Sequence, residues 1–231
     1  MTDTTSRPTR VLITGGSAGI GAALAQAYAD DGADVLTIGR RTSVDHSVPY
    51  HSIDMTTQGA MGALDSVLAG AGWDEFDILV LNAGLGHVGP LADTPPAVVD
   101  AMMAINVTVP MQMAHHYANR VNKRIVFVGS VATWGKHPNF AIYAATKAAL
   151  RGAVNSWQIE RNDDLVQIIH PGPTESEMHD RAGLKPTLMR KIFTPATIVA
   201  REMKAAIQLD KREVKFGMPF TLRHAFAKGR G

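Results

Sequence analysis

Tyr143 and Lys147 stand four residues apart in the small and apolar stretch NFAIYAATKAALRGA, and their side chains could carry acid–base chemistry. Side chains at this spacing lie one above the other on one face of a helix, so the two groups can point into one space. A tyrosine hydroxyl has a pKa of about 10, and a neighbouring ammonium group favours the phenolate and lowers that pKa. The spacing therefore indicates an acid with an electrostatic partner. The alternative is a packed ring beside a surface lysine, which is the commoner case for a random pair.

The stretch TGGSAGIG, residues 14–21, follows an apolar run and opens a helical pattern, a context that suits the phosphates of a dinucleotide. A helix that starts after a tight glycine turn presents free backbone N–H groups and the positive end of its dipole. Gly15 allows the turn, Gly19 lets the backbone approach phosphate, and Gly21 lets helix and strand pack closely. The cofactor contacts expected here are Thr14, Gly15, Ser17, Gly19, Ile20 and Gly21. The alternative is that the glycines only reverse the chain.

The next apolar run ends in IGRR, and this end predicts which dinucleotide binds. Sites that prefer NAD usually have a carboxylate here for the ribose diol, and this stretch supplies none. Arg40 and Arg41 instead suit a 2′-phosphate, because guanidinium groups bind phosphate with fixed, charge-assisted geometry. NADP(H) is therefore favoured over NAD(H), unless the two arginines are only solvated charge. Asp54, in SIDM, suits either the adenine amino group or the N-cap of the following helix.

The elements that must position these residues alternate between short β-rich apolar runs and longer helical patterns. This alternation predicts an α/β fold with a doubly wound parallel sheet, in a single dinucleotide-binding (Rossmann) domain over residues 1–231. Strands are predicted at residues 10–14, 33–39, 76–82, 124–130 and 165–170, with a further strand just before SIDM. Helices are predicted at residues 18–32, ending at Gly32, at 95–120, bent near Pro110, and at 140–161. Residues 174–194 form a long polar stretch with prolines, the kind of loop that is usually functional.

Composition excludes several classes of function. The 231 residues are 45% hydrophobic, and 23 Lys and Arg against 21 Asp and Glu give a formal charge of +2. This balance gives no reason to expect nucleic acid or an anionic membrane as partner. With no cysteine, disulfides, thiolate catalysis and zinc–thiolate sites are excluded, and no metal site is predicted. The sequence shows no signal peptide and no run that approaches a membrane span, so we expect a cytoplasmic protein.

With five motifs in order, the chain resembles the short-chain dehydrogenase/reductase family from about Arg10 to about Gly217. TGGSAGIG has the family's TGxxxGxG spacing, NAG at residues 82–84 matches its fourth-strand motif, and YAATK matches YxxxK. Ser130 lies thirteen residues before Tyr143, a usual interval in the family, and Asn106 in MAINV matches the asparagine of its catalytic tetrad. PGPTES resembles the segment that faces nicotinamide. The connection RTSVDHSVP is a departure, because it is too short for the helix usual between the second and third strands.

The resemblance implies a role for each matching residue. Tyr143 donates a proton to a substrate carbonyl as hydride arrives from NADPH, Ser130 hydrogen-bonds the same oxygen, and Lys147 also holds the nicotinamide ribose. Asn106 positions a water that relays protons to Lys147. The cofactor contacts carried over from the family are Asn82, Ala83, Gly84, Tyr143, Lys147, Pro171, Gly172 and Thr174. A homodimer or homotetramer through the two long helices is also implied, and the second helix has small residues suited to close approach at Ala141, Ala145, Ala149 and Ala153.

Two functions of different class fit these residues. One is an NADPH-dependent reductase, or the dehydrogenase of the corresponding alcohol; the other is a non-catalytic dinucleotide-binding sensor or scaffold, which would need the glycine loop but not the tetrad. The substrate depends on the expected lid at 174–194, where apolar residues suit a free ketone and basic residues suit an acidic carrier-bound 3-oxoacyl thioester. The apolar set is Met178, Leu184, Met189, Ile192 and Phe193, and the basic set is Arg181, Lys185, Arg190 and Lys191. Residues flanking the site that could shape its pocket are His87, Trp134, His137 and Phe140.

Overall fold

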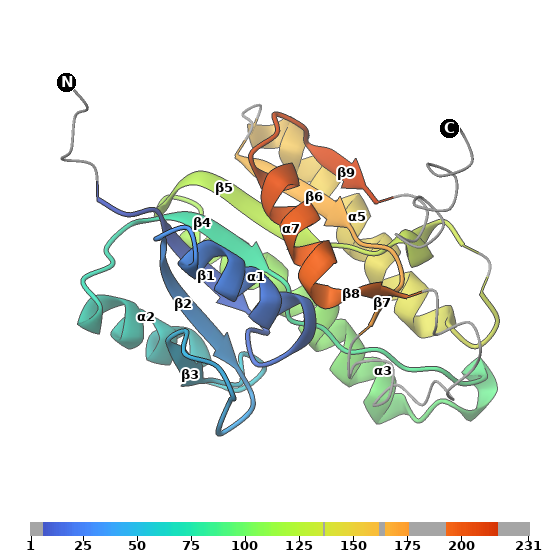
Figure 1. Cartoon of the computed structure of the whole chain (residues 1–231). Helices are drawn as coiled ribbons and strands as arrows, with labels where there is room; N and C mark the ends of the chain where they lie inside the picture. Colours follow the sequence, from blue (N-terminus) through green and yellow to red (C-terminus); the bar gives the residue numbers. More distant parts are fainter. Residues whose placement is uncertain (1–6, 136, 162–164, 176–192, 217–231) are drawn as a thin grey trace, which may run out of the picture.

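A parallel seven-stranded sheet forms the centre of the protein, in the order β3-β2-β1-β4-β5-β6-β9 (Figure 1). The computed structural model describes residues 7–135, 137–161, 165–175 and 193–216. The strands are β1 (Arg10–Thr14), β2 (Asp34–Gly39), β3 (Tyr50–Ser52), β4 (Phe76–Leu81), β5 (Val121–Val128), β6 (Val166–His170) and β9 (Glu213–Lys215). The strand order reverses between β1 and β4, which is where ligands bind in open sheets of this kind. The predicted doubly wound α/β fold is confirmed.

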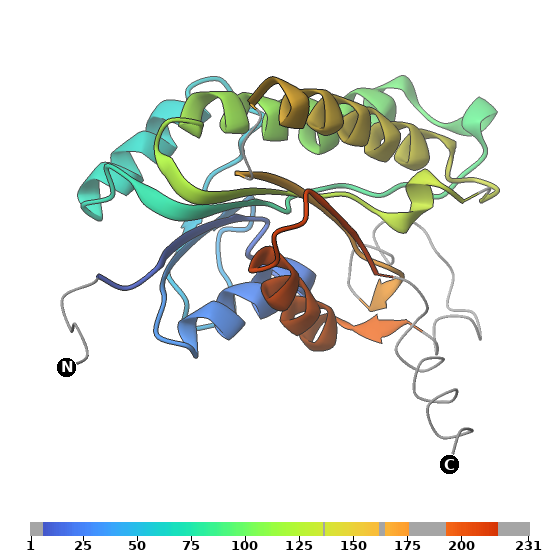
Figure 2. The same ribbon diagram turned by 90° about the horizontal axis from the view of Figure 1, so that it is seen from above.

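Helices cover both faces of this sheet, which explains why its strands are apolar on both sides (Figure 2). Val11 and Ile13 of β1 pack on one face, against α1 (Gly19–Ala29) and α7 (Ala196–Ile207). Leu12 packs on the other face, which is covered by α2 (Ala60–Gly70), α3 (Pro96–Met103), α4 (Val109–Tyr117) and α5 (Ala141–Arg161). The two apolar layers hold the strands in register and fix where each strand ends.

The long helix predicted at residues 95–120 is interrupted, as expected, but before the proline rather than at it. A π-helical turn, η2 (Ala104–Thr108), separates α3 from α4, and Pro110 lies in the first turn of α4. A proline has no N–H, so Pro110 cannot give the carbonyl of Asn106 its usual helical hydrogen bond. The irregular turn therefore includes Asn106, and π-helical turns of this kind often occur at functional sites.

Two predicted helices and one predicted connection agree with the structure to within a few residues. Helix α1 ends at Ala29, and Gly32 has a φ of 78°, the left-handed conformation common after a helix C-terminus. Helix α5 spans Ala141–Arg161. Residues 40–49, all of them described, form no helix between β2 and β3, as the short connection predicts. A helix was expected after Asp54, without bounds, where α2 lies, whereas α7 and β9 were not predicted from the sequence.

The expected lid at 174–194 is described only at its two ends. Strand β7 (Thr174–Glu175) pairs in parallel with β8 (Thr194–Pro195), and the Thr194 N–H donates to the Pro173 carbonyl at 3.0 Å. Most of the residues proposed to line the lid fall within 176–192, outside the described part of the chain.

By length and composition, the helical stretch Pro96–Tyr117 could cross a membrane. In the fold one side of this stretch packs in the core, where Met102, Ile105, Val109, Met113 and Tyr117 are buried.

Candidate active site

The carboxyl ends of β1 and β4 are joined by hydrogen bonds that fix the start of the glycine-rich turn. Thr14 Oγ1 accepts from the N–H groups of Asn82 and Ala83 at 3.0 and 2.9 Å. Asn82 Nδ2 donates to the carbonyl oxygens of Thr14 and Gly15 at 2.9 and 3.3 Å. Of the predicted cofactor contacts, Thr14 and Asn82 therefore also build the turn that carries the others.

The glycines in this turn are required by its geometry. Gly15 and Gly19 have positive φ values of 70° and 57°, which side chains rarely adopt. A Cβ atom on Gly21 would lie 2.3 Å from the carbonyl oxygen of Gly15, and one on Gly16 would lie 2.4 Å from the Thr37 side chain. The turn can therefore pass close to any ligand above it, and Gly21 acts through packing rather than contact.

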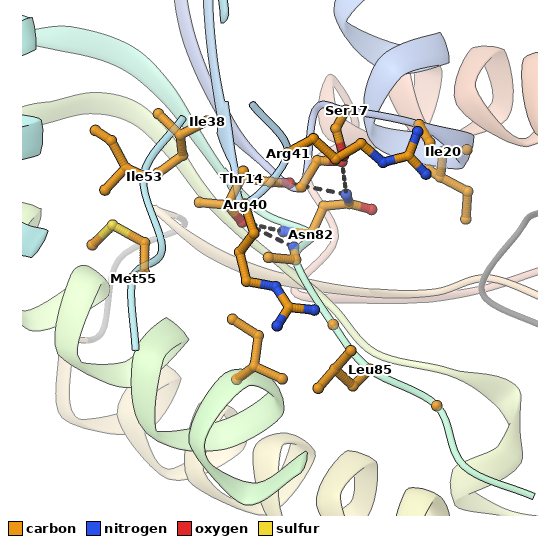
Figure 3. A pocket seen from close by; sticks show the side chains of 18 residues that line it. Thr14, Ser17, Ile20, Ile38, Arg40, Arg41, Ile53, Met55, Asn82 and Leu85 are labelled. Carbon is orange, nitrogen blue, oxygen red and sulfur yellow. Dashed lines mark hydrogen bonds between the residues drawn. The ribbon is translucent and has the colours of Figure 1, made fainter. Parts of the chain in front are cut away.

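A cavity of about 320 Å³ opens over this turn (Figure 3). Its lining includes ten of the predicted cofactor residues: Thr14, Gly15, Ser17, Gly19, Ile20, Arg40, Arg41, Asn82, Ala83 and Gly84. Helix α1 points its N-terminus at the cavity, and no described side chain caps that N-terminus or places a carboxylate in its first turn. Free N–H groups and two arginine side chains extending over the cavity form a donor set for phosphates (Figure 3). The residues present fit a dinucleotide.

The sequence analysis missed several apolar residues of the same cavity. These are Ala18, Ile38, Gly39, Ile53, Met55, Leu85, Gly86 and Ile105. Their place in the sequence could have identified them, since most of them follow or flank the motifs at the strand ends. They form the apolar walls that a planar ring of a nucleotide needs.

The carboxylate of Asp54 makes local hydrogen bonds in the described part of the chain. Its Oδ1 accepts hydrogen bonds from the N–H and the hydroxyl of Thr56, at 3.0 and 2.7 Å. The residue before α2 is Gly59, so the prediction that Asp54 caps this helix is wrong. The carboxylate instead closes a local turn, a common use of aspartate. Its neighbours Ile53 and Met55, rather than Asp54, line the cavity.

Ser130, Tyr143 and Lys147 come together at the carboxyl end of β5, as predicted. Lys147 is buried, with 5% of its surface exposed, and its Nζ donates to the Val128 carbonyl at 2.8 Å. The same Nζ lies 5.9 Å from the centre of the Tyr143 ring. The Ser130 side chain interacts with the Tyr143 hydroxyl. A tyrosine, a serine and a buried ammonium thus converge on one point.

The pKa values of this group are set mainly by burial. Burial raises the pKa of Tyr143, and the interaction with Ser130 opposes the rise. Burial also lowers the pKa of Lys147 to about 8. Without a bound cofactor the pKa of Tyr143 is therefore raised, with burial as the first cause, and the lowering expected from the Lys147 ammonium stays a prediction for the cofactor-bound protein.

Asn106 joins the catalytic group to the nucleotide cavity. Its Oδ1 accepts from the Leu85 N–H at 2.8 Å, and its Nδ2 donates to the Leu85 carbonyl at 2.9 Å and to Thr146 Oγ1 at 3.0 Å. A Cβ atom on Gly84 would lie 3.1 Å from Asn106 Oδ1 and 3.8 Å from Lys147 Nζ. Gly84 therefore places the cavity directly beside the buried lysine.

The segment after β6 completes the edge of the site. The Pro171 carbonyl accepts from the Val131 N–H at 3.2 Å, and the Thr174 hydroxyl donates to the Gly172 carbonyl at 2.9 Å. The first contact places Pro171 next to the strand end that carries Ser130, and the second is local to the segment; none of the three residues lines the described cavity.

Aromatic rings lead from the surface toward the tyrosine. The ring of Phe140 lies 6.4 Å from that of Tyr143, edge to face, and His137 lies 6.0 Å from Phe140 in the same manner. The Gly89 N–H donates to the Asn139 carbonyl at 2.9 Å, which joins the loop carrying His87 to this wall. Trp134 lies elsewhere, with its ring 4.6 Å from the ring of His170.

His170, Glu213 and Arg151 are polar residues behind Ser130 that the sequence analysis missed. His170 is fully buried, and its ring contacts the main chain of Ser130. Burial lowers the pKa of His170 to about 4. The one signal in the sequence was a histidine that ends an apolar strand directly before proline. Its partner Glu213 lies 43 residues further on in β9, beyond any local pattern.

Comparison with known proteins identifies the family. The model of short chain dehydrogenases matches residues 9–186, more than half of the chain. The chain belongs to the short-chain dehydrogenase/reductase family. It is an NAD(P)-dependent oxidoreductase by that membership, and both the predicted fold and the predicted reaction class are confirmed.

Two curated relatives illustrate the range of similarity. An uncharacterized short-chain type dehydrogenase/reductase of Sinorhizobium fredii, y4eK, is 28% identical over 215 residues, which cover 86% of this chain and 85% of the relative. The short-chain dehydrogenase RED1 of Pyricularia oryzae is 32% identical over 169 residues, 69% of this chain and 60% of the relative. The chain thus spans less than two thirds of the second protein.

Solved structures of the same fold hold either nicotinamide cofactor. A short chain dehydrogenase from Burkholderia cenocepacia in complex with NADP is 27% identical, covers 90% of this chain and 96% of its own, and has a TM-score of 0.76. A 4-hydroxyisoleucine dehydrogenase complexed with NADH is 19% identical, covers 93% and 99%, and has a TM-score of 0.77. The fold by itself therefore does not select between NADP and NAD.

Proposed function

We propose that this protein is an NADPH-dependent reductase that interconverts a ketone, or a 3-oxoacyl group, with a secondary alcohol. The observation that carries the proposal is Lys147, a buried ammonium beside both the Tyr143 ring and the Gly84 edge of the nucleotide cavity. A buried charge is costly and is rarely kept without a function. A protein that only bound a dinucleotide would need the cavity but not this lysine beside a tyrosine and a serine.

The residues of the chain divide the work of reduction as follows. When bound, the reduced cofactor supplies hydride to the substrate carbon. Tyr143 Oη donates its proton to the substrate oxygen, and Ser130 Oγ donates a hydrogen bond to that oxygen as negative charge develops on it. The raised pKa of Tyr143 keeps its hydroxyl protonated for this step. The Lys147 ammonium stabilises the phenolate that remains and returns a proton to it.

The route by which protons reach Lys147 is inferred from the irregular helical turn that contains Asn106. The side chain of Asn106 is committed to Leu85 and Thr146, so it is the Asn106 carbonyl that can hold a water. Pro110 leaves that carbonyl without its usual helical donor. We assign the relay predicted for Asn106 to this carbonyl.

Arg40 and Arg41 support a preference for NADP(H), since both lie on the cavity at the end of β2, where a carboxylate would favour NAD. Adenine contact by Asp54, a cytoplasmic location and a homodimer or homotetramer remain part of the proposal. The small residues expected at the helix interface are Ala141, Ala145 and Ala149, which are exposed, and Ala153, which is half-buried. Light scattering that gives a monomer of 24.8 kDa at micromolar concentration would contradict the assembly.

The test of the reductase is NADPH consumption with a panel of free ketones and 3-oxoacyl thioesters, for wild type and Tyr143→Phe. The substitution keeps the ring and removes the proton donor, so kcat should fall about 100-fold to 10,000-fold. The Kd for NADPH should stay within about fivefold, because a single lost hydrogen bond contributes only about 1 kcal/mol.

Tyr28→Phe is the matched control. Tyr28 is equally a helix tyrosine, but it is buried on the opposite face of the sheet, so kcat should not change. Wild-type protein that binds NADPH and reduces no member of the panel would favour the sensor or scaffold. Tyr143→Phe with more than about a tenth of wild-type kcat would assign the proton to another group.

A further inference from the structure

The main chain of Ser130 is held by the ring of His170. The Ser130 N–H donates to His170 Nδ1 at 3.2 Å, and the Ser130 carbonyl oxygen lies 3.3 Å from the same nitrogen. A Cβ atom on Gly129 would lie 2.3 Å from Nδ1, so the glycine before Ser130 makes room for the ring. On the other side of this strand end, Lys147 holds the Val128 carbonyl. The backbone leading to the serine hydroxyl is therefore fixed from two sides.

The far side of the His170 ring faces a carboxylate that selects its tautomer. Nε2 lies 3.0 Å from Glu213 Oε1, although off the direction of an in-line hydrogen bond. Arg151 holds Glu213 through two hydrogen bonds, Nε to Oε1 at 2.6 Å and Nη2 to Oε2 at 3.1 Å, and it lowers the pKa of that carboxyl. An ionised carboxylate at this distance favours a proton on Nε2 over a lone pair. Nδ1 is then free to accept from the Ser130 N–H.

The other groups around His170 keep it neutral. Its ring is 4.6 Å from that of Trp134, edge to face, and Trp134 is in turn covered by Arg151 at 5.0 Å and Lys215 at 3.6 Å. Burial and the charge of Arg151 lower the pKa of His170, while Glu213 and Ser130 act in the opposite direction. At neutral pH the ring is therefore a fixed acceptor rather than a proton carrier.

This arrangement differs from a hydrolytic triad, although serine, histidine and glutamate occur in that order. In a triad the histidine nitrogen faces the serine hydroxyl, which it deprotonates. Here the described contacts of Nδ1 go to the main chain of Ser130, and Ser130 Oγ accepts from the Ala132 N–H at 3.1 Å. The histidine can set the position of the serine but cannot act as its base.

We propose that His170 is a positioning residue for the reduction: its Nδ1 fixes the Ser130 main chain so that the hydroxyl meets the substrate oxygen together with Tyr143, and Glu213 held by Arg151 fixes the ring. The proposal rests on the reductase function. It also gives the last strand a role at the site, since Glu213 belongs to β9, beyond the residues 9–186 that match the family model. Misplacing a reacting group by about 1 Å can cost up to about 100-fold in rate, so the effect should appear in kcat.

Two amide substitutions test the Nδ1 contact and the Nε2 contact of the His170 ring separately. In His170→Asn the side-chain oxygen takes the place of Nδ1 and can still accept from Ser130, but it does not reach Glu213. In His170→Gln the amide reaches toward Glu213 and leaves the Ser130 N–H without its acceptor. We expect kcat within about threefold of wild type for the asparagine variant and at least about tenfold lower for the glutamine variant, with the Kd for NADPH unchanged in both.

Gln167→Leu is the control for general destabilisation. Gln167 is a fully buried polar residue of the same strand, and its Nε2 donates to carbonyl oxygens of Ala206 and Lys211, away from Ser130. This variant should lower the melting temperature without changing kcat. Equal kcat in the asparagine and glutamine variants, or a loss in cofactor Kd rather than in kcat, would overturn the proposal.

Nitrogen NMR of the ring tests the contact without any substrate. A His170 that is neutral with its proton on Nε2 at pH 7, and a Ser130 amide proton that exchanges with solvent faster in the glutamine variant than in the asparagine variant, support the proposal. A proton on Nδ1 overturns it. These signals do not depend on turnover, so a wild-type protein that reduces no carbonyl compound would reject the reductase while the ring contact is judged separately.

Discussion

The two halves of the ligand-binding edge of the sheet differ in the kinds of chemical group that form them. The half at β1, β2 and β4 is made of glycines, short polar side chains, apolar walls and two arginines, and it offers a ligand shape, free N–H groups and positive charge. The half at β5, β6 and β9 is made of buried ionisable side chains. Lys147 and His170 both have pKa values lowered by burial, and Tyr143 has a raised one. The first half is shaped to hold a ligand. The second keeps buried ionisable side chains, whose desolvation destabilises the fold, in a defined protonation state.

This difference implies opposite relations between stability and function. In the nucleotide half, the geometry that binds phosphate is also the geometry that packs best, so damage to one should damage the other. In the catalytic half, desolvated groups destabilise the fold, so their removal should stabilise the protein while it abolishes the reaction. Substitutions in each half test this difference.

Lys147→Met should give the largest effect, with a loss of about 1,000-fold in kcat and a rise in melting temperature. The buried ammonium makes one described hydrogen bond, to Val128, and a methionine of similar length fills the space without burying charge. The measurements are kcat with NADPH and thermal unfolding without ligand. A variant that is less stable than wild type would show that Lys147 is a structural residue and would remove the contrast.

The pH dependence of the free energy of unfolding tests how strongly the buried His170 destabilises the fold in acid. Its pKa falls from 6.5 in the unfolded chain to about 4 in the folded one, so on acidification the unfolded chain takes up the proton first. Above pH 6.5 this group does not reduce the free energy of unfolding. As the pH falls toward 4, its titration lowers that free energy by roughly 3 kcal/mol.

Urea unfolding at pH 7 and at pH 4.5 measures this loss. His170→Asn should lose less stability than wild type between the two values, because it lacks the imidazole that takes up a proton on unfolding. Identical losses in the two proteins would mean that His170 titrates normally in the folded state.

Gly21→Ala should weaken NADPH binding by about 100-fold and also lower stability, because its Cβ would lie 2.3 Å from the Gly15 carbonyl oxygen and would displace the turn. Gly62→Ala is the matched control. Gly62 lies inside α2 with open space where a Cβ atom would be added, so alanine there should stabilise the helix by up to about 1 kcal/mol and leave binding unchanged. Unchanged NADPH affinity in Gly21→Ala, measured by fluorescence titration, would show that turn geometry and binding are separable.

The nucleotide half was also the more predictable from sequence, for a physical reason. A turn, a helix start and a strand end are local, so the spacing of TGGSAGIG and the arginines of IGRR placed most of the cavity. Tyr143 and Lys147 share a helix, and their meeting followed from the helical repeat. The support behind Ser130 could not be predicted, because His170 and Glu213 meet only when β6 and β9 pair. The rise in the pKa of Tyr143 was missed because desolvation depends on the whole packed core.

Arg40 and Arg41 should give the smallest effect, since they line the cavity at the end of β2 and are expected to contact the 2′-phosphate of the cofactor alone. In the double variant Arg40→Ala/Arg41→Ala, NADPH should bind about tenfold more weakly and NADH with unchanged affinity, because one charge-assisted phosphate contact is worth about 1.4 kcal/mol. Lys123→Ala/Arg124→Ala is the control: it removes the same two positive charges from β5, outside the cavity, and should leave both affinities as they are. Fluorescence titration of both cofactors at two salt concentrations measures the difference, which added salt should reduce. Equal weakening of NADPH and NADH would show that the arginines support the fold of the β2 end, and the preference for NADP would lose its structural basis.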